Sequence, residues 1–346
     1  MIEDGARASS RPGGPRRRIA AVDLDVVFLG TSGSTPTAQR SVAATLVRRG
    51  GDRLLVDCGE GTQRQLLRSD IGLVELEEVF LTHYHADHYL GLPGMLKTFA
   101  LRGRELPLTV YGPPGLRELL RTLRRVFGKL PYRLQAVELA AGDALARDGY
   151  RIEAFDVRHG VSAVGYALVE ERRPGRFDVA TADRLGIPSG PERGALQRGE
   201  EVRLPDGTAV RPADVLGEER PGRKVVLSGD TAPAAAVVEA AAGADLLVHE
   251  ATFCAEERER ARETLHSTAG EAALVGREAG VRMLALVHLS SRYQGPDVAE
   301  EARTLFPETV VPRDFDVVEI PFPERGPPEL VARGARSGRA GVRSGL

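Results

Sequence analysis

The sequence predicts a layered α/β fold. Short apolar runs of strand length alternate with segments of helical periodicity along the 346 residues, and many of the runs end in polar residues. Hydrophobic residues make up 42% of the chain and charged residues 28%, which is typical of globular proteins and excludes a disordered or collagen-like chain. No stretch approaches the roughly 18–20 apolar residues of a membrane span, so we expect no membrane association.

The expected strands are apolar runs bounded by glycine, proline or polar residues. In chain order they are residues 22–29, 54–57, 79–82, 108–111, 151–157, 164–169, 225–227, 246–248 and 283–287. Run 108–111 is closed by Gly112-Pro113, and a polar, histidine-rich loop follows run 79–82. This spacing leaves room for helices between most consecutive strands, as a layered fold requires.

The expected helices are residues 62–67, 116–127, 234–242 and 268–279, and a further apolar segment covers 89–99. The clearest is 116–127, where Leu116, Leu120 and Leu123 recur at helical spacing with arginines between them. Gly128 follows as its stop signal. The alanine-rich segment 234–242 separates two strands in the second half of the chain.

The domain organisation predicted from composition is one domain over residues 21–323 with disordered tails at 1–20 and 324–346, both rich in Arg, Pro, Gly and Ser. Residues 170–223 carry many Gly, Pro and Arg and no strong periodicity. Because a structureless loop of about 50 residues is unusual inside a compact domain, we interpret this segment as a protruding insertion.

The charge balance is nearly even, with a formal net charge of −2, which predicts no global attraction to nucleic acid or anionic membranes. Cys58 and Cys254 are too few for a disulfide framework or a thiolate zinc site. Together with the absence of a signal-peptide pattern, they favour a reduced, cytoplasmic compartment.

The densest chemical signal is the segment from His83 to His88, which contains His83, His85, Asp87 and His88. Imidazole and carboxylate are natural ligands of zinc-like cations. In an extended segment His83 and His85 point the same way and can hold one ion. Asp87 and His88 follow as the chain turns into a helix, so they are expected to face a second ion.

Three further candidates each follow a predicted strand: His159, Asp230 and His288. Taken alone, the two histidines could be buried core residues, and Asp230 could cap the alanine-rich helix. Together with the first cluster, however, they supply the six to seven ligands that a two-metal site needs.

The His-x-His-x-Asp-His loop, the later His, the Ser-Gly-Asp sequence and the late strand-end His resemble the metallo-β-lactamase superfamily. More narrowly, the chain is similar to ribonuclease Z, the family of tRNA 3′-processing endoribonucleases, from about residue 24 to 322. The matching segments are FLGT at 28–31, DCGEGTQ at 57–63, GLPG at 91–94, VYGP at 110–113, HEATF at 249–253, HST at 266–268 and SRYQG at 291–295.

This resemblance implies an αββα sandwich, in which helices flank two mixed β-sheets, with a protruding arm. It also implies two Zn²⁺ per subunit. The implied ligands are His83, His85 and His159 for one ion, Asp87, His88 and His288 for the other, and Asp230 as the bridge. Asp87 is the expected general base. His266 is the expected acid, with Glu250 bonded to its far nitrogen, and His249 is expected to be structural.

The implied reaction is hydrolysis of one phosphodiester in precursor tRNA, which leaves a tRNA 3′-hydroxyl and a 5′-phosphate on the trailer. The family dimerises, so we expect a homodimer whose arm, residues 170–223 with the pair Gly190-Pro191, grips tRNA; no DNA substrate is expected. That arm has no net charge: residues 170–224 hold eleven basic and eleven acidic side chains. The stretch 101–133, with eight bases and two acids, is a second candidate RNA surface.

The turn after the first strand is expected to bind substrate through Gly30, Thr31 and Arg40, with backbone donors aimed at an RNA phosphate. The family's Pro-x-Lys-x-Arg-Asn pattern is matched here only at Pro36 and Arg40. Two alternatives stay open. One is a di-metal small-molecule phosphodiesterase or another hydrolase of the same fold, and the other is a non-catalytic, metal-bound RNA-binding module.

Overall fold

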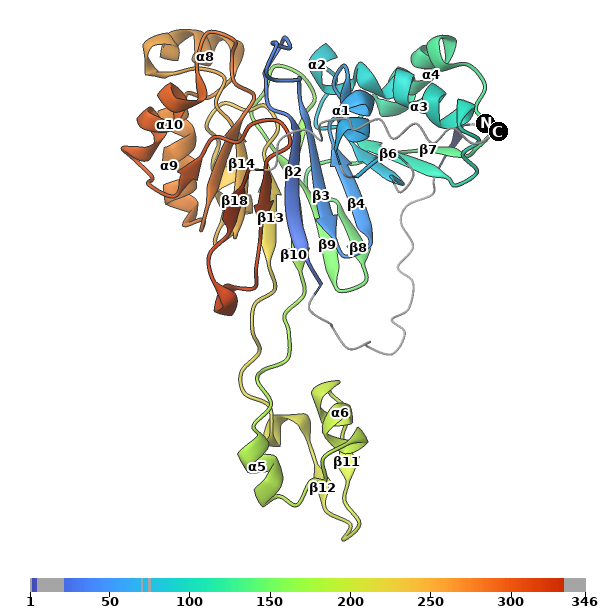
Figure 1. Ribbon diagram of the computed structural model, residues 1–346, viewed down its shortest axis with the longest axis vertical. Helices are drawn as coiled ribbons and strands as arrows, with labels where there is room; N and C mark the ends of the chain where they lie inside the picture. Colours follow the sequence, from blue (N-terminus) through green and yellow to red (C-terminus); the bar gives the residue numbers. More distant parts are fainter. Residues whose placement is uncertain (1, 5–21, 70, 74–75, 333–346) are drawn as a thin grey trace, which may run out of the picture.

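Two β-sheets packed face to face form the centre of the molecule (Figure 1). The computed structural model describes residues 2–4, 22–69, 71–73 and 76–332. Within them the first sheet has nine strands, in the order β1 (Ile2–Asp4), β7 (Leu134–Glu138), β6 (Leu108–Gly112), β5 (Glu78–Phe80), β4 (Asp52–Val56), β3 (Ala44–Arg49), β2 (Leu24–Gly30), β17 (Val317–Glu319) and β18 (Glu329–Val331). Strands β4 to β7 are parallel, whereas β2, β3 and β4 pair antiparallel, so the sheet is mixed.

The second sheet has seven strands in the described part of the chain. Their order is β16 (Thr309–Val310), β15 (Leu284–Val287), β14 (Leu246–Glu250), β13 (Lys224–Leu227), β10 (Val164–Glu170), β9 (Tyr150–Asp156) and β8 (Ala144–Arg147). Strands β13 to β16 are parallel, and β8, β9, β10 and β13 are antiparallel, so this sheet is mixed as well.

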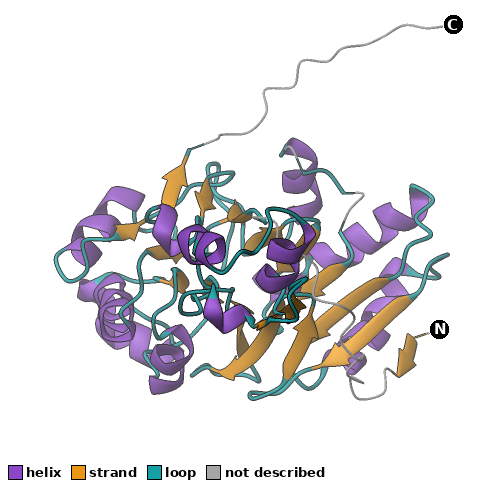
Figure 2. Ribbon diagram, turned by 90° about the horizontal axis from the view of Figure 1, so that it is seen from below, coloured by secondary structure: helices purple, strands orange, loops and turns teal. Residues whose placement is uncertain are grey.

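Helices cover the outer face of each sheet (Figures 1 and 2). The first sheet carries α1 (Thr62–Arg68), α2 (Ala86–Tyr89), α3 (Gly91–Leu101) and α4 (Leu116–Phe127). The second carries α7 (Ala235–Ala241), α9 (Ala269–Ala279) and α10 (Gly295–Arg303), with α8 (Arg258–Thr264) and the short helix η2 (Ala255–Glu257) nearby. The predicted αββα sandwich is therefore confirmed. None of the described helices combines the length and the apolar composition that crossing a bilayer requires.

The core explains why the strands appear in the sequence as continuous apolar runs. In β2, Val26 and Phe28 pack into the layer between the sheets, while Val27 and Leu29 pack under the helices of the first sheet. Strands buried on both faces cannot alternate apolar with polar residues. Helix α4 shows the opposite pattern, because its apolar residues Leu116, Leu120, Leu123 and Phe127 are buried. Arg121, Arg124 and Arg125 between them are exposed.

Several elements carried no clear sequence signal. Strand β8 is short and partly exposed, β16 has two residues, and α10 begins with the turn-like pair Gly295-Pro296. Strand β3 was missed because its sequence ends in two arginines, Arg48 and Arg49, which bond to Asp25 and to Glu170 in the folded protein. Their partners come from other strands, so no local pattern shows them.

Residues 171–223 leave the sandwich between β10 and β13 and project from it (Figure 1). This segment, here called the arm, holds α5 (Val179–Arg184), α6 (Pro191–Gln197), β11 (Val202–Arg203), β12 (Ala209–Val210) and the short helix η1 (Pro212–Asp214). Its tip has its own small core of Ala182, Ile187, Leu196, Leu204, Val210 and Val215. The arm is thus a separately packed unit rather than an irregular loop.

The predicted tail boundaries need correction. The expected C-terminal tail begins with ordered structure: the short helix η3 (Pro323–Arg325) and strand β18, which pairs antiparallel with β17. Residues Ile2–Asp4, placed in the expected N-terminal tail, form β1 and pair with β7. These strands extend a sheet edge, an interaction of backbone groups that composition does not reveal. Residues 1, 5–21 and 333–346 lie outside the described part of the chain.

Candidate metal centre

The predicted ligands gather at one edge of the sandwich, where strands of both sheets end. His83, His85, Asp87 and His88 follow β5, and His159 follows β9. Asp230 follows β13 and His288 follows β15. Because the parallel strands of each sheet end at the same edge, residues up to 205 positions apart meet there.

The first ligand group consists of His83, His85, His159 and Asp230. Nδ1 of His85 lies 3.0 Å from Nε2 of His83 and 3.1 Å from Nε2 of His159. Oδ2 of Asp230 lies 3.7 Å from Nε2 of His83. His83 and Asp230 are buried, whereas His85 is exposed, so the group opens to solvent on one side.

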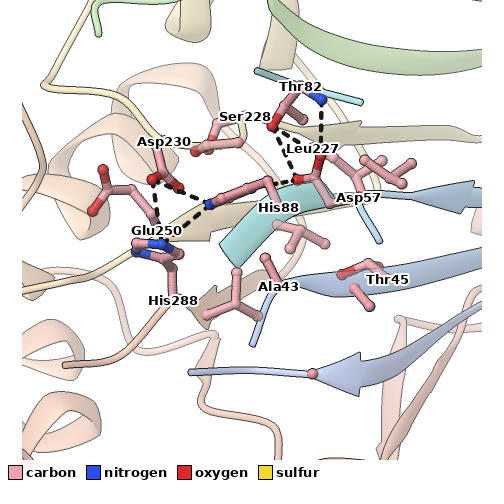
Figure 3. A pocket seen from close by; sticks show the side chains of 16 residues that line it. Ala43, Thr45, Asp57, Thr82, His88, Leu227, Ser228, Asp230, Glu250 and His288 are labelled. Carbon is pink, nitrogen blue, oxygen red and sulfur yellow. Dashed lines mark hydrogen bonds and ion pairs between the residues drawn. The ribbon is translucent and has the colours of Figure 1, made fainter. Parts of the chain in front are cut away.

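The second group consists of Asp87, His88 and His288. Nε2 of His288 lies 3.3 Å from Nε2 of His88 and 3.2 Å from Oδ2 of Asp87. Oδ2 of Asp230 is 3.4 Å from Nε2 of His88 and 3.2 Å from Nε2 of His288. The same carboxylate oxygen therefore faces both groups. Figure 3 shows Asp230, His88 and His288 pointing towards one another.

The chemistry of these nitrogens fits cations. A neutral imidazole has one N–H and one lone pair. Nδ1 of His88 faces the Asp57 carboxylate at 2.8 Å, and Nδ1 of His159 faces the carbonyl of Leu265 at 3.2 Å. When Nδ1 of His88 and Nδ1 of His159 donate these hydrogen bonds, the Nε2 atom of each ring carries a lone pair that faces the other ligands. Separations of 3.0–3.3 Å match the edge of a tetrahedral zinc site, about 3.3 Å for bonds of about 2.0–2.1 Å.

The ionisable groups of the ligand cluster shift one another's pKa values in opposite directions. Burial alone would raise the pKa of Asp230, but His288 and His88 hold it well below its usual value. Burial, followed by His88, lowers the pKa of His83 to about 2. Burial also opposes charge on His88, but Asp230 and Asp57 raise its pKa well above the usual value. Cation binding at His88 would therefore release a proton.

The ligands are held by neighbours that the sequence did not single out for this role. Oγ1 of Thr252 lies 2.8 Å from Nδ1 of His288, and the backbone N–H of Ser34 donates to Oδ2 of Asp87 at 2.7 Å. Gly33 packs so closely that a Cβ there would lie 2.5 Å from Nδ1 of His288. Ser34 acts through its backbone, for which a sequence carries no signal.

His266 forms a third candidate ligand group with Asp230 and His288, and it also pairs with Glu250. Nδ1 of His266 lies 2.7 Å from Oε1 of Glu250, and the ring stacks on His288 with centroids 5.5 Å apart. Glu250 is 1% exposed and accepts hydrogen bonds from the backbone N–H groups of Thr231 and Thr252. Burial opposes charge on His266, but Glu250 raises the pKa of His266 to about 9. His266 can therefore hold a proton at neutral pH.

His249 lies elsewhere. It is fully buried, and its Nδ1 lies 2.7 Å from the carbonyl oxygen of Glu250. Burial lowers its pKa, and none of the candidate ligand groups in the described residues includes it. Its position agrees with the structural role expected for it.

The structure shows how the turn after β2 is held, and its expected substrate contacts stay predictions. Gly30 and Thr31 are buried, and Oγ1 of Thr31 donates to Asp314 at 2.8 Å. Arg40 donates through Nη1 to Thr31 and to the carbonyl of Pro312. The backbone N–H groups of residues 32–35 bond within the protein. These contacts build the turn. The described hydrogen bonds of the Arg40 guanidinium use Nη1, so a substrate contact of Arg40 stays a prediction.

Gly190 and Pro191 lie far from the ligands, at the start of α6 in the arm. Gly190 has φ of 150°, a conformation that favours glycine, and Pro191 is the first residue of the helix. The local geometry accounts for both residue types.

Comparison with known proteins shows which family the chain belongs to. Residues 37–264 match the metallo-β-lactamase superfamily. Ribonuclease Z of Methanosarcina acetivorans is 43% identical over 302 residues, which cover 86% of this chain and 99% of that protein. Ribonuclease Z of Myxococcus xanthus is 51% identical over 271 residues, which cover 78% of this chain and 88% of that protein. The chain belongs to the ribonuclease Z family. With the clustered His and Asp ligands, this membership implies a divalent metal at the site.

Solved structures agree. Human tRNase Z, short form, superimposes with a TM-score of 0.62 at 26% identity and covers 86% of this chain and 99% of its own. The metallo-β-lactamase fold protein YhfI from Bacillus subtilis has a TM-score of 0.64 at 21% identity over 86% of this chain and 99% of its own, which shows the shared fold. Human tRNase Z, short form, therefore shares the fold found here.

Proposed function

We propose that this ribonuclease Z family member is a zinc-dependent endoribonuclease that removes the 3′ trailer from precursor tRNA. It hydrolyses one phosphodiester and leaves a 3′-hydroxyl on the tRNA and a 5′-phosphate on the trailer. The observation that carries the proposal is the His266–Glu250 pair, at 2.7 Å. It lies beside two ligand groups that both face Oδ2 of Asp230. Its relatives are named for this activity.

We assign two Zn²⁺ ions per subunit. His83, His85 and His159 would hold one, Asp87, His88 and His288 the other, and Asp230 both. Such a pair supplies Lewis-acid chemistry, because it lowers the pKa of water and neutralises charge on phosphoryl oxygens. The imidazole and carboxylate donors of the cluster suit zinc.

Asp87 acts as general base in this proposal. Its Oδ2 is held by the Ser34 N–H and lies near His288. None of the described hydrogen bonds involves its Oδ1. One oxygen is thus oriented by the protein, and the other can accept a proton from the attacking water.

His266 acts as general acid. Its Nδ1 faces Glu250, so Nε2 carries the proton that the leaving 3′-oxygen needs. Glu250 holds the ring in one orientation and favours its protonated form. Glu250 is therefore a positioning residue, since it acts on the substrate only through His266.

The arm supports a homodimer. It leaves the sandwich at Glu170, the end of β10, and returns at Lys224, the start of β13. The metal ligands lie at the opposite ends of these strands: Val164 at the start of β10 bonds to Thr82, and Asp230 follows the end of β13. An arm pointing away from its own metal centre would be suited to hold tRNA for a partner's centre. We assign tRNA binding to this arm, and an RNA track to the exposed arginines of α4. The two buried, unpaired cysteines favour a cytoplasmic location.

The test is cleavage of a precursor tRNA with a short 3′ trailer, by wild type and His266→Ala, with and without chelator. We expect a single metal-dependent cut next to the tRNA 3′ end, slowed about 10²–10⁴-fold in His266→Ala. An unchanged zinc content in the variant would show that the metal centre is intact. If bis(p-nitrophenyl) phosphate is hydrolysed but the tRNA is not cut, the alternative of a small-molecule phosphodiesterase is correct instead.

The role of the arm needs its own variant. Replacing residues 176–217 by a short Gly-Ser linker removes a unit with its own core, so the sandwich should still fold. Cleavage of precursor tRNA should fall sharply while hydrolysis of bis(p-nitrophenyl) phosphate persists. Undiminished tRNA cleavage would rule out the arm as the tRNA-binding element.

A further inference from the structure

A groove opens from the metal centre on the side of His266. It has a volume of about 290 Å³. Its wall begins at Gly33 and Thr252, which contact the ligands, and passes His266. It ends at residues 260–264 and 290–292, which lie outside the ligand groups. The groove is therefore continuous with the site but extends beyond it.

The lining of this groove suits an anion. Arg260 and Arg292 lie on its wall, together with hydroxyl side chains. The hydroxyl residues are Ser34, Thr35, Thr252, Thr264, Ser290 and Ser291. Among the described residues, the lining includes no aspartate or glutamate. Arginine and hydroxyl side chains are among the groups that contact nucleic-acid phosphates.

The two arginines are available to a ligand. Arg260 is exposed, and the described contacts include no ion pair for its guanidinium. Arg292 is paired with Glu257 at 3.3 Å, but its side chain is 47% exposed, and exposed ion pairs of this kind are weak. A phosphate in the groove can therefore compete for Arg292 and does not have to displace a partner from Arg260.

The position of His266 indicates which side of the scissile bond the groove would bind. In phosphoryl transfer the attacking and leaving oxygens lie roughly in line, on opposite sides of phosphorus. A donor that serves the leaving 3′-oxygen therefore marks the side of the nucleotide carrying that oxygen. His266 lines the groove, and its Nδ1 lies 3.9 Å from Oδ2 of Asp230. The groove is thus on the tRNA side of the cut, and the trailer leaves on the other side.

We propose that Arg260 and Arg292 bind phosphates of the RNA strand 5′ of the scissile bond, in the groove beside His266. This inference rests on the proposed function, because the direction of the strand follows from the leaving group of that reaction. The groove then selects for a polynucleotide, since a small phosphodiester has no second phosphate to place there.

The test combines single-residue variants with neutral phosphates. Precursor tRNAs would carry one methylphosphonate at each of the three phosphates on either side of the cut. The proteins are wild type, Arg260→Gln, Arg292→Gln and Arg262→Gln. Arg262 lies on α8, as Arg260 does, and is exposed, but it does not line the groove. Arg262→Gln therefore controls for the loss of one positive charge.

We expect Arg260→Gln and Arg292→Gln each to lower kcat/KM for precursor tRNA about tenfold, as for loss of a charged hydrogen bond, with Arg262→Gln unchanged. In wild type, a methylphosphonate at one of the 5′ phosphates should cost about the same factor. In the variant that lacks the arginine bound to that phosphate, the same methylphosphonate should lower kcat/KM much less. The reason is that the substitution and the methylphosphonate remove the same interaction.

The failures are distinguishable. If wild type does not cut precursor tRNA, the proposed function fails. If wild type cuts but both arginine variants cut as fast as Arg262→Gln, the groove inference alone is wrong. It is also wrong if the 5′ methylphosphonates cost the same in wild type and both variants, or if only trailer-side methylphosphonates couple to Arg260 and Arg292.

Discussion

Asp57 holds the ring of His88 and the backbone of Thr82 at the same time. Its Oδ2 lies 2.8 Å from Nδ1 of His88, and its Oδ1 accepts the backbone N–H of Thr82 at 2.8 Å. Asp57 follows β4 with φ of 60° and is 5% exposed. One buried carboxylate thus positions the segment that carries four of the predicted ligands.

Replacing Asp57 by asparagine should weaken metal binding about 10–100-fold, as is typical for partners of metal-bound histidines. The amide can turn its NH₂ towards Nδ1 of His88, so it no longer favours the tautomer with a lone pair on Nε2. Competition with a fluorescent zinc chelator measures the effect. Asp25→Asn, which removes a partner of Arg48 away from the site, is the control. Equal zinc affinities for Asp57→Asn and wild type would contradict the positioning role.

The shared position of Asp230 predicts metal stoichiometries. Wild type should hold two zinc ions per chain, measured by plasma mass spectrometry after dialysis. His159→Ala removes a ligand of one group and should retain about one ion, whereas Asp230→Ala removes a ligand of both groups and should retain fewer. Since a ligand that binds only the folded state stabilises it, chelation should also lower the melting temperature of wild type. One ion in wild type, or equal losses in the two variants, would contradict the assignment of Asp230 as a bridge.

The pair Glu250 and His266 predicts a shift in the pH dependence of cleavage. A general acid must be protonated, so activity is lost as pH rises through its pKa. Glu250 raises the pKa of His266, and Glu250→Gln should therefore move the alkaline limb of kcat/KM to lower pH, by about 1–2 units. A pH profile on precursor tRNA measures it. An alkaline limb at the same pH in both proteins would show that His266 is not the group that titrates there.

The root of the arm predicts a pH-dependent stability. Glu170 bonds to Arg223 through both carboxylate oxygens and to Arg49 at 2.8 Å. Burial opposes its charge, but Arg223 and Arg49 lower its pKa in the folded state. A lowered folded-state pKa gives stability that is present above the unfolded value, about 4.3, and is lost as pH falls through the folded value.

Glu170→Gln should therefore lower the free energy of unfolding at pH 7 by about 3 kcal/mol, because two buried guanidinium groups lose their counter-charge. The difference from wild type should shrink as the pH falls below 4. Denaturant unfolding of chelated protein measures this without a contribution from metal release. Glu200→Gln, which removes an exposed partner of Arg198 in the arm, should have little effect. A difference that stays constant from pH 7 to pH 3 would be inconsistent with the lowered pKa.

The sequence by itself determined the fold class and the metal-binding residue types. His83, His85, Asp87 and His88 lie in six consecutive residues, and the apolar runs before the ligands are long enough to specify buried strands. Such signals are local, because ligand type, strand length and helical period can all be read within a window of about a dozen residues. The pairing of Glu250 with His266 could be expected only from the family resemblance.

The tertiary structure decided what each polar group faces. Thr31 and Arg40 lie in the turn after β2. Oγ1 of Thr31 donates to Asp314 and Nη1 of Arg40 donates to Pro312, and both acceptors lie more than 270 residues further along the chain. Arg260 and Arg292 are 32 positions apart in the sequence, and only the fold places them on one groove. The direction in which a side chain points and the groups around it depend on how distant strands pack against each other. This is why they could not be predicted from the order of the residues.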